Sequence, residues 1–307
     1  MQVTAAMVKE LRDKSGAGMS ACKNALVDAN GDMERAGEIL REKGLTAAAK
    51  KSGRIAAEGI VAAQSSDDRK TGVLVEINIE TDFAAKNSLF RDFAAQVANQ
   101  VMESEADGTD ELLAEQWAAD ASITVKDALM QKIAVIGENI NIRRFEKYVA
   151  CCGGAVVQYV HGGGKVAVMA QFNTDIVDDA FVEAGKNICM QIAAMSPKFV
   201  SRSDMSEEFI AKEKEILTQL TINEGKPANI AGKIVEGRLA KSLKDYCLIE
   251  QEYVKDAELT VEAYLKKVSL EIGSEVSVKR FVRFETGEGI EKKEENFAEE
   301  VNKAIQG

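Results

Sequence analysis

Two glycine-rich runs contain residue types that could bind a phosphate. Gly16-x-Gly18-x-x-Ala21 matches a dinucleotide-binding pattern, and Gly162-Gly163-Gly164-Lys165 is similar to a phosphate-binding loop. The first pattern needs a preceding strand, yet a helical pattern precedes it here. The second lacks the required spacing and the following Ser or Thr, and it joins two predicted strands. We therefore expect a helix connection and a hairpin turn, and no bound nucleotide.

His161 is the single histidine of the chain and could in principle transfer a proton. No neighbouring motif supplies an orienting partner or a nucleophile, so we expect a turn or contact residue. The carboxylate pairs Glu207-Glu208 and Glu294-Glu295 fall on charged helical faces, which are typically solvated. These patterns favour a binding protein over an enzyme, with no catalytic residue, metal site or cofactor.

The most informative run is Thr81-Asp82-Phe83-Ala84-Ala85-Lys86. It follows Val73–Ile79, where apolar residues alternate with Glu76 and Asn78 as in a half-buried strand. A large aromatic side chain therefore lies at a strand exit, just before a predicted helix. Phe83 can be a buried corner residue, as phenylalanines usually are, or a wedge directed at a partner.

An internal repeat provides a comparison for this corner. Residues 166–176 repeat the pattern of 73–83, and residues 272–281 repeat that of 136–145, in the same order. We interpret this as two copies of one αβ unit, roughly 59–149 and 154–284. The second copy has Ile176 where the first has Phe83, which favours a special role for the aromatic residue.

The elements that must position these residues form an α+β protein with antiparallel sheets. Residues 4–44 predict three short helices, the last closed by Gly44, in a module of the ubiquitin-associated type. A partly helical tether (45–58) follows, and residues 104–122 are acidic and looser. Residues 206–223 and 228–246 predict an antiparallel helical hairpin inserted in the second copy. Phe297, Val301 and Ile305 predict a C-terminal helix.

The predicted domains are a helical module with tether, two core subdomains and a C-terminal module. Their ranges are 1–53, 54–149, 150–284 (with the hairpin at 204–246) and 285–307.

The bulk composition limits the partners. A formal net charge of -11 argues against non-specific binding to nucleic acid or to anionic lipid. No apolar run is long enough to span a bilayer, and the first residues do not resemble a signal peptide. Five cysteines without paired spacing indicate a reducing compartment, hence the cytoplasm, with mostly buried thiols at Cys151-Cys152.

Several motifs together resemble one known family, bacterial elongation factor Ts. They are Val8-Lys9-Glu10-Leu11-Arg12, Ser15-Gly16-Ala17-Gly18-Met19, Cys22-Lys23-Asn24-Ala25-Leu26, Thr81-Asp82-Phe83, Ile136-Gly137-Glu138-Asn139-Ile140 and Gly287-Glu288-Gly289-Ile290-Glu291-Lys292. They occur in family order along nearly the whole chain. The architecture that the resemblance implies is the one described above.

The resemblance implies a guanine-nucleotide exchange factor for the GTPase elongation factor Tu, without catalytic chemistry of its own. It implies that Thr81, Asp82, Phe83 and Ala84 form the segment that dislodges the partner's Mg²⁺, although the family usually has Val at the position of Ala84. It also implies partner contacts at a second set of residues, namely Met19, Ile136, Gly137 and His161. The factor would stay bound until GTP binds again.

Three alternatives stay open at this point. Asp82 either competes for groups around the metal or caps the next helix. The hairpin either pairs with a second copy, giving a homodimer, or contacts a partner, or folds back on its own core. The whole chain could instead be a scaffold that causes no nucleotide release from a partner. It could also be a small-molecule enzyme, which would need a concave polar site that no motif in the sequence indicates.

Overall fold

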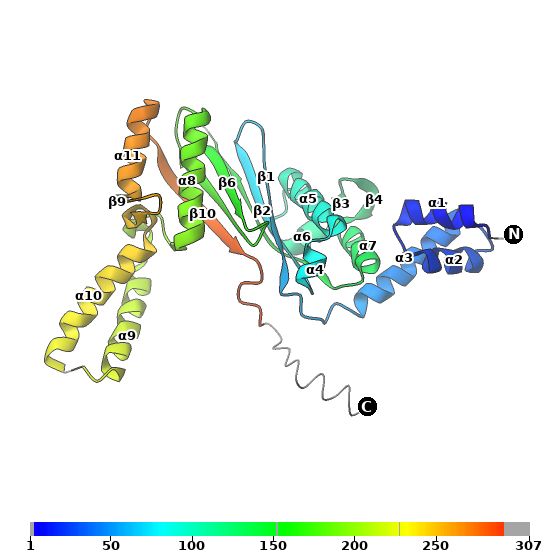
Figure 1. The fold of residues 1–307 in the computed structure, drawn as a ribbon, viewed down its shortest axis with the longest axis horizontal. Helices are drawn as coiled ribbons and strands as arrows, with labels where there is room; N and C mark the ends of the chain where they lie inside the picture. Colours follow the sequence, from blue (N-terminus) through cyan, green and yellow to red (C-terminus); the bar gives the residue numbers. More distant parts are fainter. Residues whose placement is uncertain (1–2, 152, 227, 292–307) are drawn as a thin grey trace. The chain divides into compact units, whose positions relative to one another are not determined.

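The computed structural model describes residues 3–151, 153–226 and 228–291 of the 307-residue chain. Helices and antiparallel strand pairs give the α+β class expected from the sequence (Figure 1). The described residues form two compact units. One comprises 3–62, 75–145 and 285–291, and the other comprises 63–74, 146–151, 153–226 and 228–284. The four predicted domain ranges stay predictions.

The chain begins with three helices, α1 (Ala5–Ser15), α2 (Met19–Asp28) and α3 (Met33–Ala49). Thr4 and Asp32 cap α1 and α3 through side-chain oxygens, and Gly16 ends α1 in the left-handed conformation. Their shared core is small and is built from Val8, Leu11, Cys22, Ala25, Leu26, Ala29 and Ala36. Kinship to ubiquitin-associated modules stays a prediction.

The expectation that Gly44 closes the third helix is wrong, because α3 continues to Ala49 and takes up part of the predicted tether. Gly44 faces α7 (Val125–Ile136), where a Cβ atom on it would lie 3.1 Å from the Cβ of Ala134. Arg41, one turn earlier, forms an ion pair with Asp127 at 2.9 Å. Packing against α7 thus uses the missing side chain and overrides glycine's preference for helix ends.

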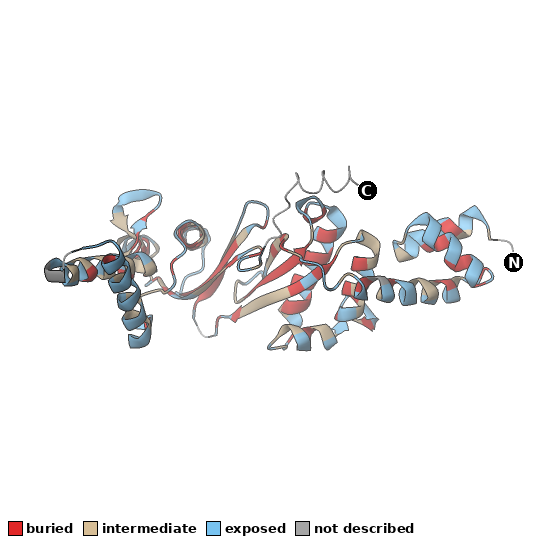
Figure 2. Ribbon diagram, turned by 90° about the horizontal axis from the view of Figure 1, so that it is seen from below, coloured by how far each residue is buried: buried red, intermediate tan, exposed pale blue. Residues whose placement is uncertain are grey.

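The first sheet has the order β1-β2-β5, from β1 (Glu58–Ser65), β2 (Thr71–Ile79) and β5 (Ile140–Val149). Nearly all of β2 is buried. Figure 2 shows both buried and half-buried stretches along the strands. After β2 come α4 (Asp82–Ala85) and α5 (Ser88–Glu103), and α7 leads into β5. The end of β2 and the start of β5 are neighbours at the same end of this sheet, where the N–H of Asn139 bonds Glu80.

Residues 104–122 are more ordered than the sequence suggested. They hold α6 (Thr109–Ala114), β3 (Gln116–Trp117) and the start of β4 (Asp120–Thr124). The buried Gln100 of α5 organises them. Its amide nitrogen donates to Glu115 Oε2 (2.9 Å) and to the carbonyl of Gln116 (3.2 Å), and its oxygen accepts from the N–H of Ala118 (2.8 Å).

The second sheet has the order β10-β7-β6, from β6 (Ala155–His161), β7 (Val166–Asn173) and β10 (Ser277–Glu285). Against it pack α8 (Asp179–Met195) and α11 (Val261–Ile272). Before α11, β8 (Glu252–Tyr253) and β9 (Asp256–Thr260) have the same register as β3 and β4. Gln191 repeats the hydrogen bonds of Gln100, which supports the interpretation as a duplication.

Between α8 and β8 lie two longer helices, α9 (Glu207–Asn223) and α10 (Ala228–Tyr246), flanked by the short turns η1 (Arg202–Asp204) and η2 (Leu248–Glu250). The helices run side by side (Figure 1). Arg238 of α10 bonds both carboxylate oxygens of Glu224 and contacts Thr221. At their base, Met205, Leu243 and Cys247 form a small core. Ile216, Leu220, Ile222 and Ile230 are exposed.

The last described turn is anchored on a buried carboxylate. Glu76 of β2 has no exposed surface and accepts hydrogen bonds from Arg143, Arg144, Asn78 and the N–H of Gly287. Burial by itself would raise the pKa of Glu76. The N–H of Gly287, the amide of Asn78 and the two guanidinium groups outweigh burial and lower that pKa below its ordinary value.

Three further expectations concern single segments. The C-terminal helix predicted from Phe297, Val301 and Ile305 lies outside the described residues. The expectation of a buried thiol is wrong for Cys151, which is exposed in the segment between β5 and β6, and Cys152 lies outside the described residues. Within the described ranges, no helix combines the length and apolarity needed to cross a membrane.

Candidate functional site

The Thr81 corner is a tight reversal set by two helix caps in close succession. Thr81 Oγ1 accepts the N–H of Ala84 at 3.2 Å and begins α4, which is only four residues long. Asn87 Oδ1 accepts the N–H of Leu89 at 2.9 Å and begins α5. The chain therefore turns twice within seven residues, which places one face of α4 at the surface.

Phe83 occupies that outer face. It is 82% exposed, whereas Ala84 and Ala85 on the other face are buried. The interpretation of Phe83 as a buried corner residue is therefore wrong: alanines, not the aromatic ring, pack α4 onto its own chain. A large aromatic side chain is therefore held in water at the surface, on a turn that two helix caps fix. Ala84 is only 6% exposed, and its N–H is held by Thr81.

Asp82 is the first residue of α4 and is exposed. Its carboxylate pairs with Lys86 one turn later, at 2.7 Å. The alternative that Asp82 caps the next helix is wrong, because Thr81 caps α4 and Asn87 caps α5. Position favours Thr81 as the cap, since only the residue before the first helical turn can accept that turn's free N–H groups. Asp82 is left as a charged surface group beside Phe83.

The end of α7 meets this corner. Gly137 ends α7 in the left-handed conformation at a φ of 90°, and Ile136 before it is half-buried. Glu138 then reaches back to Thr81, where its two oxygens accept the backbone N–H (3.0 Å) and the hydroxyl (2.8 Å). The structure thus brings Thr81–Ala84 and Ile136–Gly137 together, through a glutamate that sequence reasoning did not single out.

Met19 and His161 lie elsewhere. Met19 is the first residue of α2 and is 48% exposed. His161 ends β6, next to a hairpin turn in which Gly162, Gly163 and Gly164 all have positive φ. Among the described contacts, none joins either residue to the Thr81 corner.

His161 has an orienting partner that the sequence analysis missed. The hydroxyl of Tyr159 lies 2.9 Å from His161 Nδ1, and the two rings are 5.9 Å apart. Residues two apart on a strand point to the same face, so the spacing itself could have indicated the pair. Both side chains lie on the hairpin formed by β6 and β7. The turn of this hairpin is Gly162-Gly163-Gly164-Lys165, the run first considered as a phosphate-binding loop.

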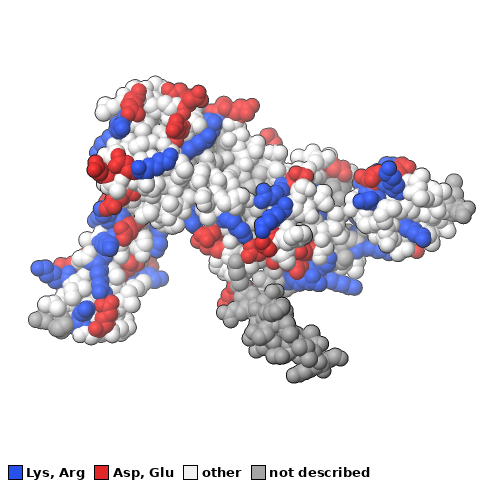
Figure 3. All heavy atoms as spheres, viewed as in Figure 1, with Lys and Arg blue, Asp and Glu red and all other residues white. Residues whose placement is uncertain are grey.

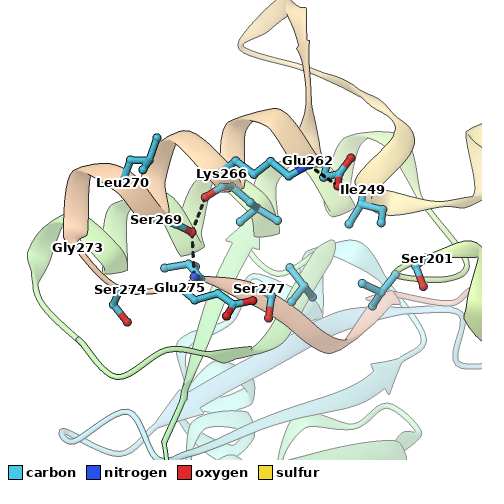
Figure 4. A pocket seen from close by; sticks show the side chains of 14 residues that line it. Ser201, Ile249, Glu262, Lys266, Ser269, Leu270, Gly273, Ser274, Glu275 and Ser277 are labelled. Carbon is cyan, nitrogen blue, oxygen red and sulfur yellow. Dashed lines mark hydrogen bonds and ion pairs between the residues drawn. The ribbon is translucent and has the colours of Figure 1, made fainter.

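A pocket of about 890 Å³ lies between α11 and β10 (Figure 4). Several of its polar groups are already paired. Lys266 bonds Glu262 at 2.7 Å, and Ser269 links the carbonyl of Leu265 to the N–H of Val276. Aliphatic and small residues form most of the rest of its wall. Within the described residues, no serine of this wall is hydrogen-bonded to a lysine or glutamate of the wall, and these residues contain no cluster of metal-ligating side chains.

Charge is distributed without a dominant sign on the face drawn in Figure 3, where basic and acidic side chains are interspersed. Gly16 and Gly18 end one helix and begin the next, as expected, so no strand presents them to a phosphate.

Comparison with known proteins gives a consistent result. A family model described as elongation factor TS matches residues 80–288. Elongation factor Ts of Clostridium perfringens (strain SM101 / Type A) is 51% identical over 301 residues, which cover 98% of each chain. Those of Clostridium novyi (strain NT) and Clostridioides difficile (strain 630) are 49% and 48% identical over 303 residues, covering 99% of each chain.

Proposed function

This chain belongs to the elongation factor Ts family, and from that premise we propose that it binds elongation factor Tu with GDP and promotes release of the GDP. The observation that carries the proposal is the exposed Phe83, held on a short helix whose alanines are buried. The factor performs no chemistry of its own and needs no cofactor. It acts in the cytoplasm, without direct contact to nucleic acid or membrane.

The proposed mechanism is differential binding. A GTPase holds GDP through phosphate contacts and a bridging Mg²⁺. A factor that binds the nucleotide-free GTPase more tightly than the loaded one must, by reciprocity, weaken the nucleotide's affinity. The Thr81–Ala84 segment displaces the Mg²⁺ and repacks the nucleotide site, and the factor stays bound until GTP binds again.

Phe83 supplies the insertion. Its ring is already free of its own core, so no unfolding is needed before it enters a partner. Truncating a central aromatic anchor typically costs about 2–4 kcal/mol of binding. Each 1.4 kcal/mol, roughly, is a tenfold change in an equilibrium. Phe83 can therefore account for a large share of the effect.

Asp82 competes for groups around the partner's metal. Its bond to Lys86 joins two exposed side chains, and such pairs contribute at most about 1 kcal/mol. Ala84 acts indirectly, by packing α4 beneath Phe83.

The remaining contacts are Met19, Ile136, Gly137 and His161. Met19 contacts the nucleotide-binding domain of elongation factor Tu, and His161 contacts a more distant domain of it. Their surface positions are compatible with these roles. The hairpin 204–246 contacts the partner or a second copy through its exposed apolar residues, and deletion of 206–246 followed by a mass measurement in solution tests the homodimer.

The test is release of fluorescent GDP from the cognate elongation factor Tu, measured with this protein and with Phe83→Ala. The matched control is Ile176→Ala, at the equivalent corner of the second copy. We expect fast release that is slowed strongly by Phe83→Ala and little by Ile176→Ala.

Two results would contradict parts of the proposal. Equal release with Phe83→Ala would keep the exchange function and exclude the insertion of this ring. Binding to elongation factor Tu without faster release by the unchanged chain would leave the scaffold alternative.

A further inference from the structure

Two carboxylates lock the Thr81 corner to the loop that follows α7. Glu138, from that loop, accepts both the N–H and the hydroxyl of Thr81. Glu80, from the end of β2, accepts the N–H of Asn139 at 2.6 Å. Each loop therefore presents a carboxylate to the backbone of the other. We refer to Glu80 and Glu138 together as the carboxylate lock.

The sheet explains why these loops meet. β2 and β5 are neighbours, and α7 feeds β5 through the turn at Gly137. Asn139 also donates from its side chain to the carbonyl of Arg54 at 2.8 Å, in the segment after α3. Arg54 in turn lies 3.5 Å from Glu80. The lock thus joins three separate stretches of chain at the base of the corner.

The second copy of the αβ unit lacks both acids. At the position of Glu138 it has Ser274, whose hydroxyl accepts a single hydrogen bond from the N–H of Asp175 at 3.2 Å. At the position of Glu80 it has Asn173, which donates to Ser277. Charge-assisted hydrogen bonds are roughly twice as strong as neutral ones. The copy with the exposed aromatic ring is therefore the copy with the stronger fastening.

We infer that Glu138 is the positioning residue of the Thr81–Phe83 corner, holding it ready, relative to the end of α7, for insertion into the partner. The inference rests on the proposed function and adds a residue to it. Without Glu138, Thr81 loses both of its bonds to the α7 loop, and the corner must be ordered during each encounter. Ordering the corner at the moment of binding costs free energy and so weakens the contact. A corner that is already ordered avoids this cost.

The kinetic test uses Glu138→Ala and Glu138→Gln, with Ser274→Ala as the matched control. Fluorescent GDP release is measured against factor concentration, so that the maximal rate and the half-saturating concentration are separated. We expect Glu138→Ala to lower the maximal rate about tenfold or more. The half-saturating concentration should move less, because Met19, Ile136 and His161 are unchanged. Glu138→Gln retains one acceptor oxygen, so its maximal rate should lie between those of Glu138→Ala and the unchanged chain. Ser274→Ala should match the unchanged chain.

A second measurement does not depend on elongation factor Tu. Amide hydrogen exchange of residues 80–88 reports the order of the corner in the free protein. Glu138→Ala should exchange faster there, while β2 keeps its protection. This readout tests the positioning role even if the unchanged chain fails to release GDP, so the two ideas can fail separately.

Unaltered exchange at residues 80–88 overturns the inference, and so does a maximal release rate equal to that of the unchanged chain. Loss of protection in β2 as well as in the corner also overturns it, because Glu138 would then support the fold as a whole. Glu138→Gln keeps the side chain's size, so the test stands even if the alanine variant folds poorly.

Discussion

Replacing Glu76 with glutamine removes a buried charge while keeping the shape of the side chain. Glu76 is fully buried, and its two oxygens accept bonds from Arg143 Nη1 (2.9 Å), Arg144 Nε (2.6 Å), Asn78 (3.0 Å) and Gly287 (2.8 Å). In Glu76→Gln, one oxygen becomes an NH₂ group that faces these donors. At least one donor therefore loses its partner, and both guanidinium groups lose the negative charge of Glu76.

The expected loss can be estimated from burial. Breaking a buried ion pair by removing one partner costs about 3–5 kcal/mol. The arginine side chains are 25% and 33% exposed, so water can recover part of their solvation. We therefore expect the low end, about 3 kcal/mol of unfolding free energy. With a urea dependence of about 2 kcal/mol per molar, the midpoint should fall by about 1.5 M.

The chain provides its own probe for this measurement. Trp117, the single tryptophan, is buried against Phe93 at 5.8 Å between ring centroids. It belongs to the same compact unit as Glu76. Its fluorescence in urea therefore reports the unfolding of the part of the molecule that contains the mutation.

Acid supplies an independent check with a defined sign. The folded-state pKa of Glu76 is lowered, so its contribution to stability is present above the unfolded-state pKa and is lost as pH falls through the folded one. The unchanged chain should lose stability below about pH 4, and its advantage over Glu76→Gln should shrink there.

A loss below about 1 kcal/mol for Glu76→Gln at pH 7 would refute the reasoning, since that is the range of exposed ion pairs. The control is Glu288→Gln. Glu288 bonds Arg144 at 3.1 Å from a side chain that is 52% exposed, and its replacement should cost less than about 1 kcal/mol.

Three further outcomes are expected. Gly287→Ala should destabilise by about 2 kcal/mol or more, because the residue has a φ of 73° and its Cβ would lie 2.1 Å from the carbonyl oxygen of Ala57; the tryptophan signal in urea measures this. Gln191→Leu should cost about 2 kcal/mol, because it leaves the buried Gln251 side chain and two part-buried backbone groups unpaired, and calorimetry should show a lower transition temperature. Burial raises the pKa of the Cys189 thiol, so iodoacetamide at pH 8 should label exposed Cys151 and spare Cys189 until the protein unfolds, as peptide mass mapping would reveal.

The spacing of apolar residues predicted most helices and strands, because each element buries one or both of its faces in the nearby core and this leaves a periodic pattern in the sequence. It failed where a distant partner decides the outcome. Gly44 has the residue type of a helix end, yet the spatial neighbour Ala134 makes it an interior position. Residues 104–122 seemed loose because their order depends on Gln100, whose partners cannot be inferred from local pattern.

The corner itself was recognisable, since a Thr-Asp pair and an aromatic residue at a strand exit form an unusual local combination. Its support was not. Glu138 lies 57 positions from Thr81, and only the pairing of β2 with β5 brings the two together. Asp and Thr are both good helix caps, so residue type alone cannot separate Thr81 from Asp82. Only backbone geometry shows that Thr81 is the cap of α4.

The bond from Gly287 to Glu76 spans 211 positions of sequence, and this has a consequence for how the protein is made. A ribosome produces Glu76 and its strand early, yet the N–H that completes the carboxylate's set of donors emerges only after the entire second copy has been translated. Glu76 therefore cannot gain its bond from Gly287 until the last part of the chain has been made. A nascent chain truncated before residue 287 should be more sensitive to protease in its first copy than the released protein.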